Sequence, residues 1–166
     1  MKQNSKVALI TGASAGIGLE FARVFAREGY ALIIVARNGE KLLTLKSELE
    51  SSGCPVEVIP LDLTQSNSRR KLFEQIGAPI DVLVNNAGFG DFGPFSKSNW
   101  LDQEKMIELN ITALTELAHL FLPQMLERNQ GKIINGASTA AFQAGPFMSV
   151  YYATKAFVLH FSEALA

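Results

Sequence analysis

The sequence VALITGASAGIG at residues 7–18 decides the fold. Residues 7–10 form a short apolar run, as in a parallel strand that is covered on both faces, and Thr11 and Gly12 end it. The residues that follow are glycine, alanine, serine and isoleucine only, so the backbone can approach a large ligand while a helix begins beneath it. Because a helix N-terminus offers unpaired N–H groups and the positive end of a dipole, this turn favours a phosphate.

The glycines of the turn are Gly12, Gly16 and Gly18, spaced T-G-x-x-x-G-x-G, which differs from the common dinucleotide fingerprint G-x-G-x-x-G. A tight strand-to-helix turn without a ligand is the simpler interpretation, because glycine permits such turns in any protein. The position of the turn within a strand-helix-strand unit favours a dinucleotide. A second apolar strand, ALIIVA at residues 31–36, follows about 20 residues later, where a dinucleotide fold places the residue that contacts the ribose.

Composition and charge restrict the classes of function. The chain has 166 residues, enough for one domain with a substantial core, and 48% of them are hydrophobic. A formal net charge of -1 gives no indication of a nucleic-acid or membrane partner. Cys54 is the only cysteine, which excludes an intrachain disulfide and a thiolate metal site and favours the cytoplasm. The polar start, MKQNSK, lacks the apolar core of a signal peptide, and nothing approaches the ~20 apolar residues of a membrane-spanning helix.

The rest of the chain alternates strands with helices. Pro123 is expected to bend or interrupt the longest helix. Five strands separated by helices predict an α/β fold: a doubly wound, parallel, Rossmann-type sheet of order 3-2-1-4-5 in a single domain over residues 1–166, with a dinucleotide between strands one and four. Strands are expected at residues 7–10, 31–36, 56–60, 80–84 and 133–134, and helices from the glycine turn to Gly29, from Asn38 to Gly53, and at residues 66–76, 99–127 and 151–166.

A tyrosine and a lysine are placed to act together. Tyr151 and Lys155 are four residues apart, so on a helix they project from the same face and can meet. An isolated tyrosine has a pKa of about 10 and is a poor general acid or base near neutral pH. A neighbouring cation favours the phenolate, so we expect Lys155 to lower the pKa of Tyr151. The plainer interpretation is a surface packing pair. Tyr152 is not the candidate acid, since no lysine lies four residues after it.

Four motifs occur in a familiar order: Thr11-Gly12-x-x-x-Gly16-x-Gly18, Asn85-Asn86-Ala87-Gly88, Ser138 and Tyr151-x-x-x-Lys155. With them the chain resembles the short-chain dehydrogenase/reductase family, in its TGxxxGxG and YxxxK branch, over nearly its whole length. The resemblance implies an NAD(P)-dependent oxidoreductase that transfers a hydride between the nicotinamide and a carbonyl or alcohol. It implies the catalytic residues Ser138, Tyr151, Lys155 and Asn110. It places the cofactor on Gly12, Ser14, Ala15, Gly16, Ile17, Gly18, Arg37, Asp62, Leu63, Asn86, Ala87, Gly88, Tyr151 and Lys155.

The resemblance gives each catalytic residue a role, and some of them have a plainer alternative. Ser138 is expected to end a strand, and its hydroxyl would hydrogen-bond the substrate oxygen, although such a serine more commonly caps a turn. Asn110 would hold a water that links Lys155 to solvent, although an asparagine within a helix can simply bond locally. Asp62 and Leu63 would hold the adenine, although Asp62 could instead cap a helix. His119 and His160 are expected to be packing or partly exposed residues without a ligand, and no metal is expected.

The choice of cofactor depends on Arg37. A dinucleotide fold that prefers NAD usually has an acidic residue at the end of its second strand, where it binds the ribose 2′-OH, whereas an arginine accommodates the 2′-phosphate of NADP. No aspartate or glutamate occurs in residues 35–38. The sequence therefore predicts NADP, with NAD less favoured. The alternative is that Arg37 pairs with a nearby acidic group.

The sequence also departs from the family. Family members continue past the lysine helix with two further strands and a mobile lid, whereas this sequence stops at Ala166, inside that helix. We expect the last two strands and most of the substrate pocket to be absent. The fifth strand would then be an exposed edge that is prone to self-association, and catalysis would be weak or lost.

Three functions remain in competition. The favoured one is a carbonyl reductase or alcohol dehydrogenase for an apolar small molecule, since Ala137 and the loop at residues 89–95 leave apolar surroundings near Ser138. The resemblance further implies a homo-oligomer, either a dimer or a tetramer. The alternative is a truncated, inactive module for dinucleotide binding or assembly. A sugar-nucleotide epimerase relative also uses Tyr-x-x-x-Lys, but the glycine spacing disfavours it.

Overall fold

The fold is built on five parallel strands in the order β3-β2-β1-β4-β5, as the sequence predicts. The computed structural model describes residues 6–166, so most of the polar start of the chain lies outside the described residues. Neighbouring strands pair in parallel throughout. The strands are β1 (Val7–Thr11), β2 (Ala31–Ala36), β3 (Val56–Pro60), β4 (Val82–Asn85) and β5 (Lys132–Asn135).

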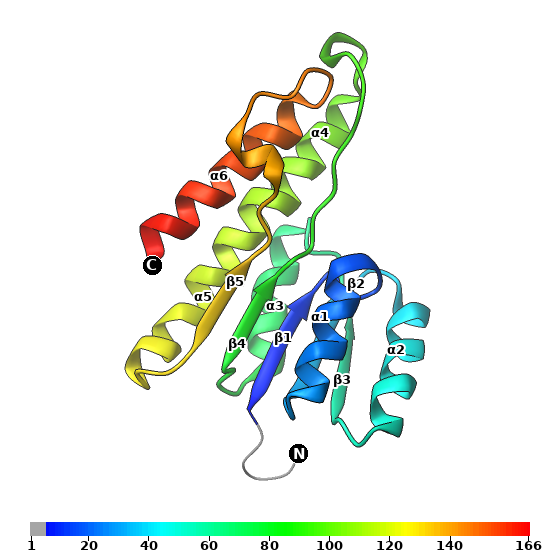
Figure 1. Cartoon of the computed structure of the whole chain (residues 1–166), viewed down its shortest axis with the longest axis vertical. Coiled ribbons are helices and arrows are strands. Elements are labelled where there is room, and N and C mark those ends of the chain that lie inside the picture. Colours follow the sequence, from blue (N-terminus) through cyan, green and yellow to red (C-terminus); the bar gives the residue numbers. More distant parts are fainter. Residues whose placement is uncertain (1–5) are drawn as a thin grey trace.

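Helices connect the strands and cover both faces of the sheet (Figure 1). Asn38 begins the second helix as predicted, because its side chain accepts a hydrogen bond from the backbone N–H of Lys41. The helices are α1 (Gly16–Arg27), α2 (Gly39–Ser51), α3 (Ser66–Ile76), α4 (Trp100–Ile107), the π-helical η2 (Glu108–Ala113), α5 (Leu114–Glu127) and α6 (Ser149–Leu165), with the short 3-10 helices η1 (Phe95–Lys97) and η3 (Thr139–Phe142).

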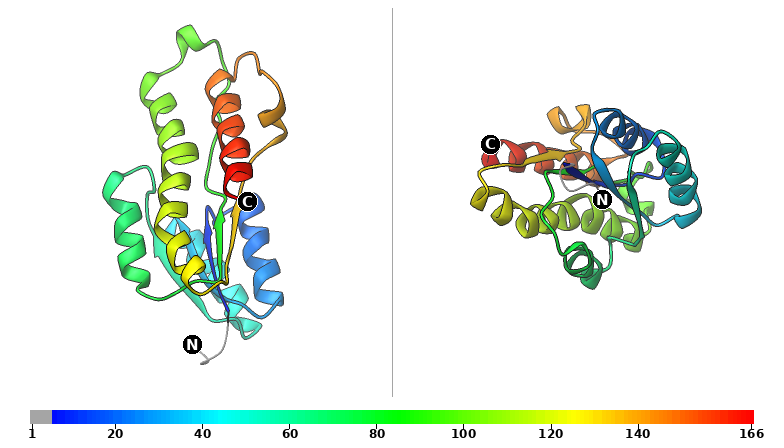
Figure 2. Two further views of the ribbon diagram at one scale, coloured as in Figure 1. Left: turned by 90° about the vertical axis from the view of Figure 1, so that its left-hand side faces the viewer. Right: turned by 90° about the horizontal axis from the view of Figure 1, so that it is seen from below.

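The sheet separates two apolar cores, because successive residues of a strand point to opposite faces. In β1, Ala8 and Ile10 lie in the core beneath α1 and α2, whereas Leu9 lies in the core beneath α3 and α5. Figure 2 shows α1 on one side of the sheet and α3 with α5 on the other. Covering on both faces explains why β1 and β2 are continuous apolar runs rather than alternating ones.

The longest helical segment differs from the prediction. α4, η2 and α5 form one continuous rod (Figure 1), and Pro123 lies inside α5, which continues to Glu127, so the proline does not interrupt the helix. The irregular part is η2, a π-helical segment at residues 108–113. A π-turn accommodates an extra residue and commonly occurs at functional sites. Here it contains Asn110, whose side chain is held by partners far along the chain.

Two strand ends also differ from the prediction. β4 begins at Val82 rather than at residue 80, and β5 ends at Asn135. Ser138 therefore does not end a strand. It lies three residues further on, where its hydroxyl accepts a hydrogen bond from the backbone N–H of Ala140 at the start of η3.

β5 is an edge strand within the described residues, pairing with β4 alone. Lys132 at its start is exposed, and the three residues after it are half-buried. An exposed lysine is one of the features that discourage strands from pairing edge to edge. Self-association through this edge stays a prediction.

Thr11 joins β1 to β4 at their carboxyl ends. Its buried hydroxyl donates to the Val84 carbonyl at 3.1 Å and accepts from the backbone N–H groups of Asn86 at 3.0 Å and Ala87 at 3.1 Å. A hydroxyl has one donor and two acceptor positions, so Thr11 uses all of them. Thr11 thereby holds together β1 and β4, the two strands between which the strand order reverses.

Replacing Thr11 by valine tests this joint. Thr11→Val keeps the side-chain volume but leaves the Ala87 N–H without its partner, whereas the Asn86 N–H and the Val84 carbonyl still bond each other at 3.1 Å. We therefore expect the free energy of unfolding to fall by about 2 kcal/mol. The control is Thr44→Val, which removes an exposed hydroxyl bonded to the Glu40 carbonyl and should cost less than about 0.5 kcal/mol. Urea titrations of both variants give the two values. Equal losses would contradict a special role for Thr11.

Candidate functional site

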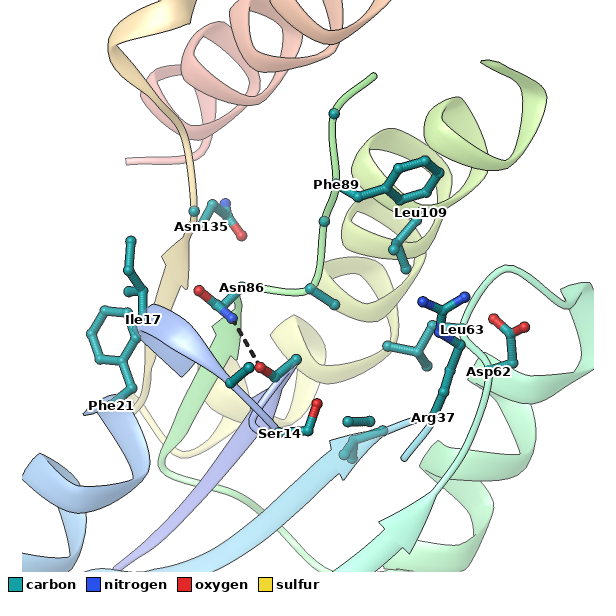
Figure 3. Close-up of a pocket in the computed structure, with 18 of the residues that line it drawn as sticks. Ser14, Ile17, Phe21, Arg37, Asp62, Leu63, Asn86, Phe89, Leu109 and Asn135 are labelled. Atoms are coloured by element: carbon teal, nitrogen blue, oxygen red, sulfur yellow. Dashed lines mark hydrogen bonds between the residues drawn. The ribbon is translucent and has the colours of Figure 1, made fainter. Parts of the chain in front are cut away.

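A cavity of about 950 Å³ opens at the carboxyl ends of the strands (Figure 3). Parallel sheets bind ligands at this end, where the strand order reverses. Figure 3 shows Ile17 and Phe21 on one side of the cavity, Arg37 with Asp62 and Leu63 on the other, and Asn86 between them. The predicted site residues that line the cavity are Gly12, Ser14, Ala15, Ile17, Arg37, Asp62, Leu63, Asn86, Ala87, Gly88, Tyr151 and Lys155.

The glycine turn forms the floor of the cavity. Gly12 and Gly16 have φ angles of +69° and +57°, in the left-handed region that favours glycine. Neither Gly16 nor Gly18 lines the cavity. Gly18 is required beneath it, because a Cβ there would lie 2.3 Å from the Gly12 carbonyl oxygen. Ala15 precedes α1 and offers no side-chain cap. The first turn of α1 therefore keeps backbone N–H groups for a ligand.

Asn86 supports the glycine turn from β4. Its side-chain Nδ2 donates to the Thr11 carbonyl at 3.1 Å and to the Gly12 carbonyl at 3.4 Å, and Figure 3 marks a hydrogen bond from this amide to the turn. Asn86 also lines the cavity. The residue therefore shapes the floor whether or not it touches a ligand.

Arg37 and Asp62 lie across the cavity from Ile17 and Phe21 (Figure 3). Arg37 is exposed, and within residues 6–166 it forms no ion pair, so the alternative pairing with an acid is not seen. The carboxylate of Asp62 accepts hydrogen bonds from the backbone N–H and the hydroxyl of Thr64. Because the N-cap of α3 is Gln65, Asp62 holds a turn and does not cap the helix.

Tyr151 and Lys155 face the same cavity from α6. The Lys155 Nζ lies 5.8 Å from the centre of the Tyr151 ring and donates to the Gly136 carbonyl at 2.7 Å. Lys155 is only 8% exposed, so the alternative of a surface packing pair is wrong for it. Burial lowers the pKa of Lys155 below its ordinary value of 10.5, because an ammonium group is poorly solvated there.

The chain after Asn86 passes close to both α6 side chains. A Cβ on Gly90 would lie 2.9 Å from the Tyr151 ring, and one on Gly88 would lie 2.9 Å from the Asn110 amide oxygen and 3.5 Å from the Lys155 Nζ. Only glycine fits without displacing these groups. Tyr152 does not line the cavity, and its ring lies against Gly145 instead.

Ser138 and Asn110 do not line the cavity. The Ser138 hydroxyl caps η3, which was the plainer alternative for it. The buried Asn110 amide bonds both backbone groups of Phe89, at 3.1 and 2.9 Å, and the Thr154 hydroxyl at 3.0 Å. It therefore bonds across the fold and not locally. It joins the loop after β4 to α6 beside Lys155.

Several lining residues were missed from the sequence. Asn135 is the last residue of β5 and Gly136 directly follows it, and neither was predicted. Ala137, Phe89 and Gly90 also line the cavity, whereas the sequence placed them only in the apolar surroundings of Ser138. Their position at or just after the end of a strand was the available signal, because all five parallel strands end at this edge. His119 and His160 are exposed and lie outside the cavity. Residues 6–166 contain no group of metal-ligating side chains that could hold an ion, and none of the helices there is long and apolar enough to cross a membrane.

The sheet order, the helices on both faces and the cavity at the switch point define a doubly wound α/β protein of the Rossmann type. Within that class, the sequence model described as short chain dehydrogenase matches residues 6–166. The chain belongs to this family, as the resemblance of its motifs predicts.

Individual relatives agree with this assignment. The ketoacyl reductase HetN of Nostoc sp. is 35% identical over 163 residues, which cover 96% of this chain and 57% of that protein. The bulky-bulky ketone specific alcohol dehydrogenase from Comamonas testosteroni has a TM-score of 0.93 at 38% identity, covering 98% of this chain and 67% of that one. A short-chain dehydrogenase from Sphingobium yanoikuyae in complex with NADPH has a TM-score of 0.92 at 39% identity, covering 96% and 64%. The chain thus spans little more than half the length of the curated relative.

The buried charge of Lys155 predicts an unusual pH dependence of stability. Since burial lowers the pKa of Lys155 below 10.5, the unfolded chain binds more protons than the folded one between that lowered pKa and 10.5, and the stability of the parent rises with pH in this window. Lys155→Met has no such group. At neutral pH we expect its free energy of unfolding to equal or exceed that of the parent, by an excess that shrinks as the pH approaches 10.5.

Urea titrations between pH 7 and 10.5 measure this excess. The control is Lys41→Met, which removes an exposed positive charge from α2 and should keep the pH profile of the parent. A Lys155→Met variant that is much less stable than the parent at pH 7, with a deficit independent of pH, would contradict the prediction.

Proposed function

We propose that this chain forms a single dinucleotide-binding domain, residues 1–166, of an NADP(H)-dependent oxidoreductase acting on a carbonyl or alcohol. The observation that carries the proposal is a single cavity lined by the glycine turn, by Arg37 and by the Tyr151–Lys155 pair. Its volume of about 950 Å³ is within the range of roughly 300–1,000 Å³ common for ligand sites. The NADPH complex of the Sphingobium yanoikuyae enzyme supports the choice of cofactor.

The residues present fit this cofactor at both ends of the cavity. The glycine turn and the uncapped first turn of α1 suit a diphosphate, because close backbone approach and free N–H groups occur together there. Arg37, exposed at the end of β2, suits a 2′-phosphate, which a guanidinium can bind with two hydrogen bonds. Asp62 and Leu63 provide the wall for the adenine, and Lys155 the donor for the nicotinamide ribose. When bound, the nicotinamide supplies or accepts the hydride.

Tyr151 acts as the general acid and base. In the reducing direction its hydroxyl gives a proton to the substrate oxygen, and in the oxidising direction its phenolate takes one. The positive charge of Lys155 stabilises that phenolate, since the two groups lie together in a partly buried site where charges interact more strongly than in water. Gly90 keeps the ring in place, because the backbone there lies directly against it.

Ser138 and Asn110 complete the catalytic set. The Ser138 oxygen accepts a hydrogen bond from Ala140, which leaves its own hydrogen to donate to the substrate oxygen as charge develops there. Asn110 holds the Phe89 backbone against Thr154, one residue before Lys155, and thereby supports the water path to the lysine.

Apolar side chains favour an apolar substrate. Phe92 and Phe147 are exposed, with ring centres 5.8 Å apart, and they belong to the loops that follow β4 and precede α6. The Comamonas testosteroni enzyme, which is described as specific for bulky-bulky ketones, supports a ketone or alcohol. A cytoplasmic location and a dimer or tetramer complete the proposal, without nucleic acid or membrane as a partner.

The proton transfer is tested by Tyr151→Phe. Without the phenol we expect kcat for NADPH oxidation with a panel of apolar ketones to fall by about 100- to 10,000-fold, while NADPH binding is retained. Tyr152→Phe is the matched control, since it removes the neighbouring hydroxyl, and should stay within a few-fold of the parent. A Tyr151→Phe variant as fast as the parent would rule out Tyr151 as the proton donor. Binding of NADPH by a parent without turnover of any ketone or alcohol would support the non-enzymatic alternative.

The cofactor preference is tested by Arg37→Ala. Because a guanidinium and a phosphate form charge-assisted hydrogen bonds, we expect the Kd for NADPH to rise by about 10- to 100-fold and the Kd for NADH to change little. Arg70→Ala removes an exposed arginine from α3 and serves as the control. Fluorescence titration of both cofactors measures the four values. An equal loss for NADPH and NADH would contradict a contact with the 2′-phosphate.

A further inference from the structure

A buried arginine next to the cavity has no part in the function proposed so far. The side chain of Arg69, on α3, is only 4% exposed. Its Nε pairs with Glu116 of α5 at 2.5 Å, and its Nη1 with Glu108 of η2 at 3.4 Å. The same Nη1 donates to the carbonyl oxygen of Leu63 at 2.8 Å. A single guanidinium thus joins α3, the π-helical segment, α5 and the loop after β3.

An unpaired buried charge is strongly unfavourable, and a guanidinium is kept in such a place only where several acceptors surround it. Arg69 has two carboxylates and one carbonyl around it, and its planar fork of donors can bond them in different directions at once. The two carboxylates would suffice to neutralise and orient it. The additional bond to Leu63 connects this ion-pair group to the wall of the cavity.

The loop that Arg69 holds forms the adenine end of the proposed cofactor site. Its first residue, Leu61, is anchored to β2, because its N–H donates to the Ala36 carbonyl at 3.0 Å. Two residues later the chain is anchored again by Arg69, through the carbonyl of Leu63. Asp62 lies between these two anchors, and all three loop residues line the cavity. The position of this wall therefore depends on both bonds.

We propose that Arg69 is a positioning residue for the cofactor: by holding the Leu63 carbonyl it fixes the adenine wall of the cavity and sets the affinity for the adenosine half of the dinucleotide. The inference rests on the function proposed above, and it adds a residue that does not touch the ligand. An arginine that only fastened α3 to α5 would affect stability and leave the affinity of the folded protein unchanged.

Binding of 2′,5′-ADP to the folded protein tests the inference, because this fragment contains the adenosine 2′-phosphate and no nicotinamide. In Arg69→Met the Leu63 carbonyl loses its donor and the wall loses one of its anchors, so we expect the Kd for 2′,5′-ADP to rise about tenfold. In the same variant we expect the KM for NADPH to rise by a similar factor and kcat at saturating NADPH to stay within twofold of the parent. Calorimetric titration, at a temperature where circular dichroism shows the variant folded, gives the Kd.

Arg128→Met is the matched control. Arg128 also joins a carboxylate to a backbone carbonyl, with its Nη2 2.6 Å from the Ile80 oxygen and its Nη1 3.4 Å from Asp81, but those partners precede β4 at the far end of the sheet. It should lose stability and bind 2′,5′-ADP like the parent. A folded Arg69→Met variant with the affinity of the parent would overturn the inference, as would an equal loss of affinity in Arg128→Met.

Glu116→Gln tests the positioning role of Arg69 if Arg69→Met does not fold. The amide keeps the shape of the carboxylate and removes the charge that orients Arg69, so we expect the Kd for 2′,5′-ADP to rise by about threefold. A folded Glu116→Gln variant with the affinity of the parent would also overturn the inference. Failure of the parent to bind 2′,5′-ADP would remove the proposed cofactor itself, and this inference with it, so the two failures are distinguishable.

Discussion

The structure depends on the hydroxyl of Thr11, which uses its donor and both acceptor positions to join the carboxyl ends of β1 and β4. A doubly wound sheet leaves a crevice where the chain changes direction, and these two strands form its sides. If they separated there, the buried Thr11 hydroxyl and the backbone groups that it bonds would lose their partners. The Asn86 amide adds two further bonds from β4 to the glycine turn. The glycine turn is therefore tied to the end of β4 at the base of the crevice.

The segment that follows this joint connects the glycine turn to the Tyr151–Lys155 pair. Directly after Ala87, the backbone passes Asn110 and Lys155 at Gly88, then bonds the Asn110 amide through Phe89, and then lies against the Tyr151 ring at Gly90. The contacts at Gly88 and Gly90 leave no space for a Cβ, and the backbone of Phe89 is hydrogen-bonded. These contacts fix the position of the segment relative to α6. The glycine turn and the tyrosine–lysine pair, separated by more than half of the chain, are thus placed relative to one another by the few residues that follow Ala87.

The sequence predicts those parts of the fold that depend on residues close together in the chain. Strands covered on both faces must be apolar throughout, so β1 and β2 and the sheet order follow from short runs and from the rules of right-handed connection. The glycine turn follows from backbone freedom and spacing. The π-helical segment at residues 108–113 could not be predicted, because it arises where Asn110 bonds a loop 21 residues before it and a helix 44 residues after it. The position of Ser138 beyond the end of β5 could not be predicted either, because the length of β5 is set by its pairing with β4.

Lys155 shows why the side chains at the cavity need a firmly held helix. An ammonium group has three donors, and within the described chain the Gly136 carbonyl is the acceptor that its Nζ reaches. Burial without further partners disfavours the charge, as the lowered pKa of Lys155 shows. A displacement of α6 would relieve this by moving the lysine into water, but the bond from the Asn110 amide to the Thr154 hydroxyl ties α6 to the π-helical segment beside Lys155. Lys155 is thereby kept at the wall of the cavity, where the oxygen atoms of a bound ligand would provide the acceptors that burial denies it.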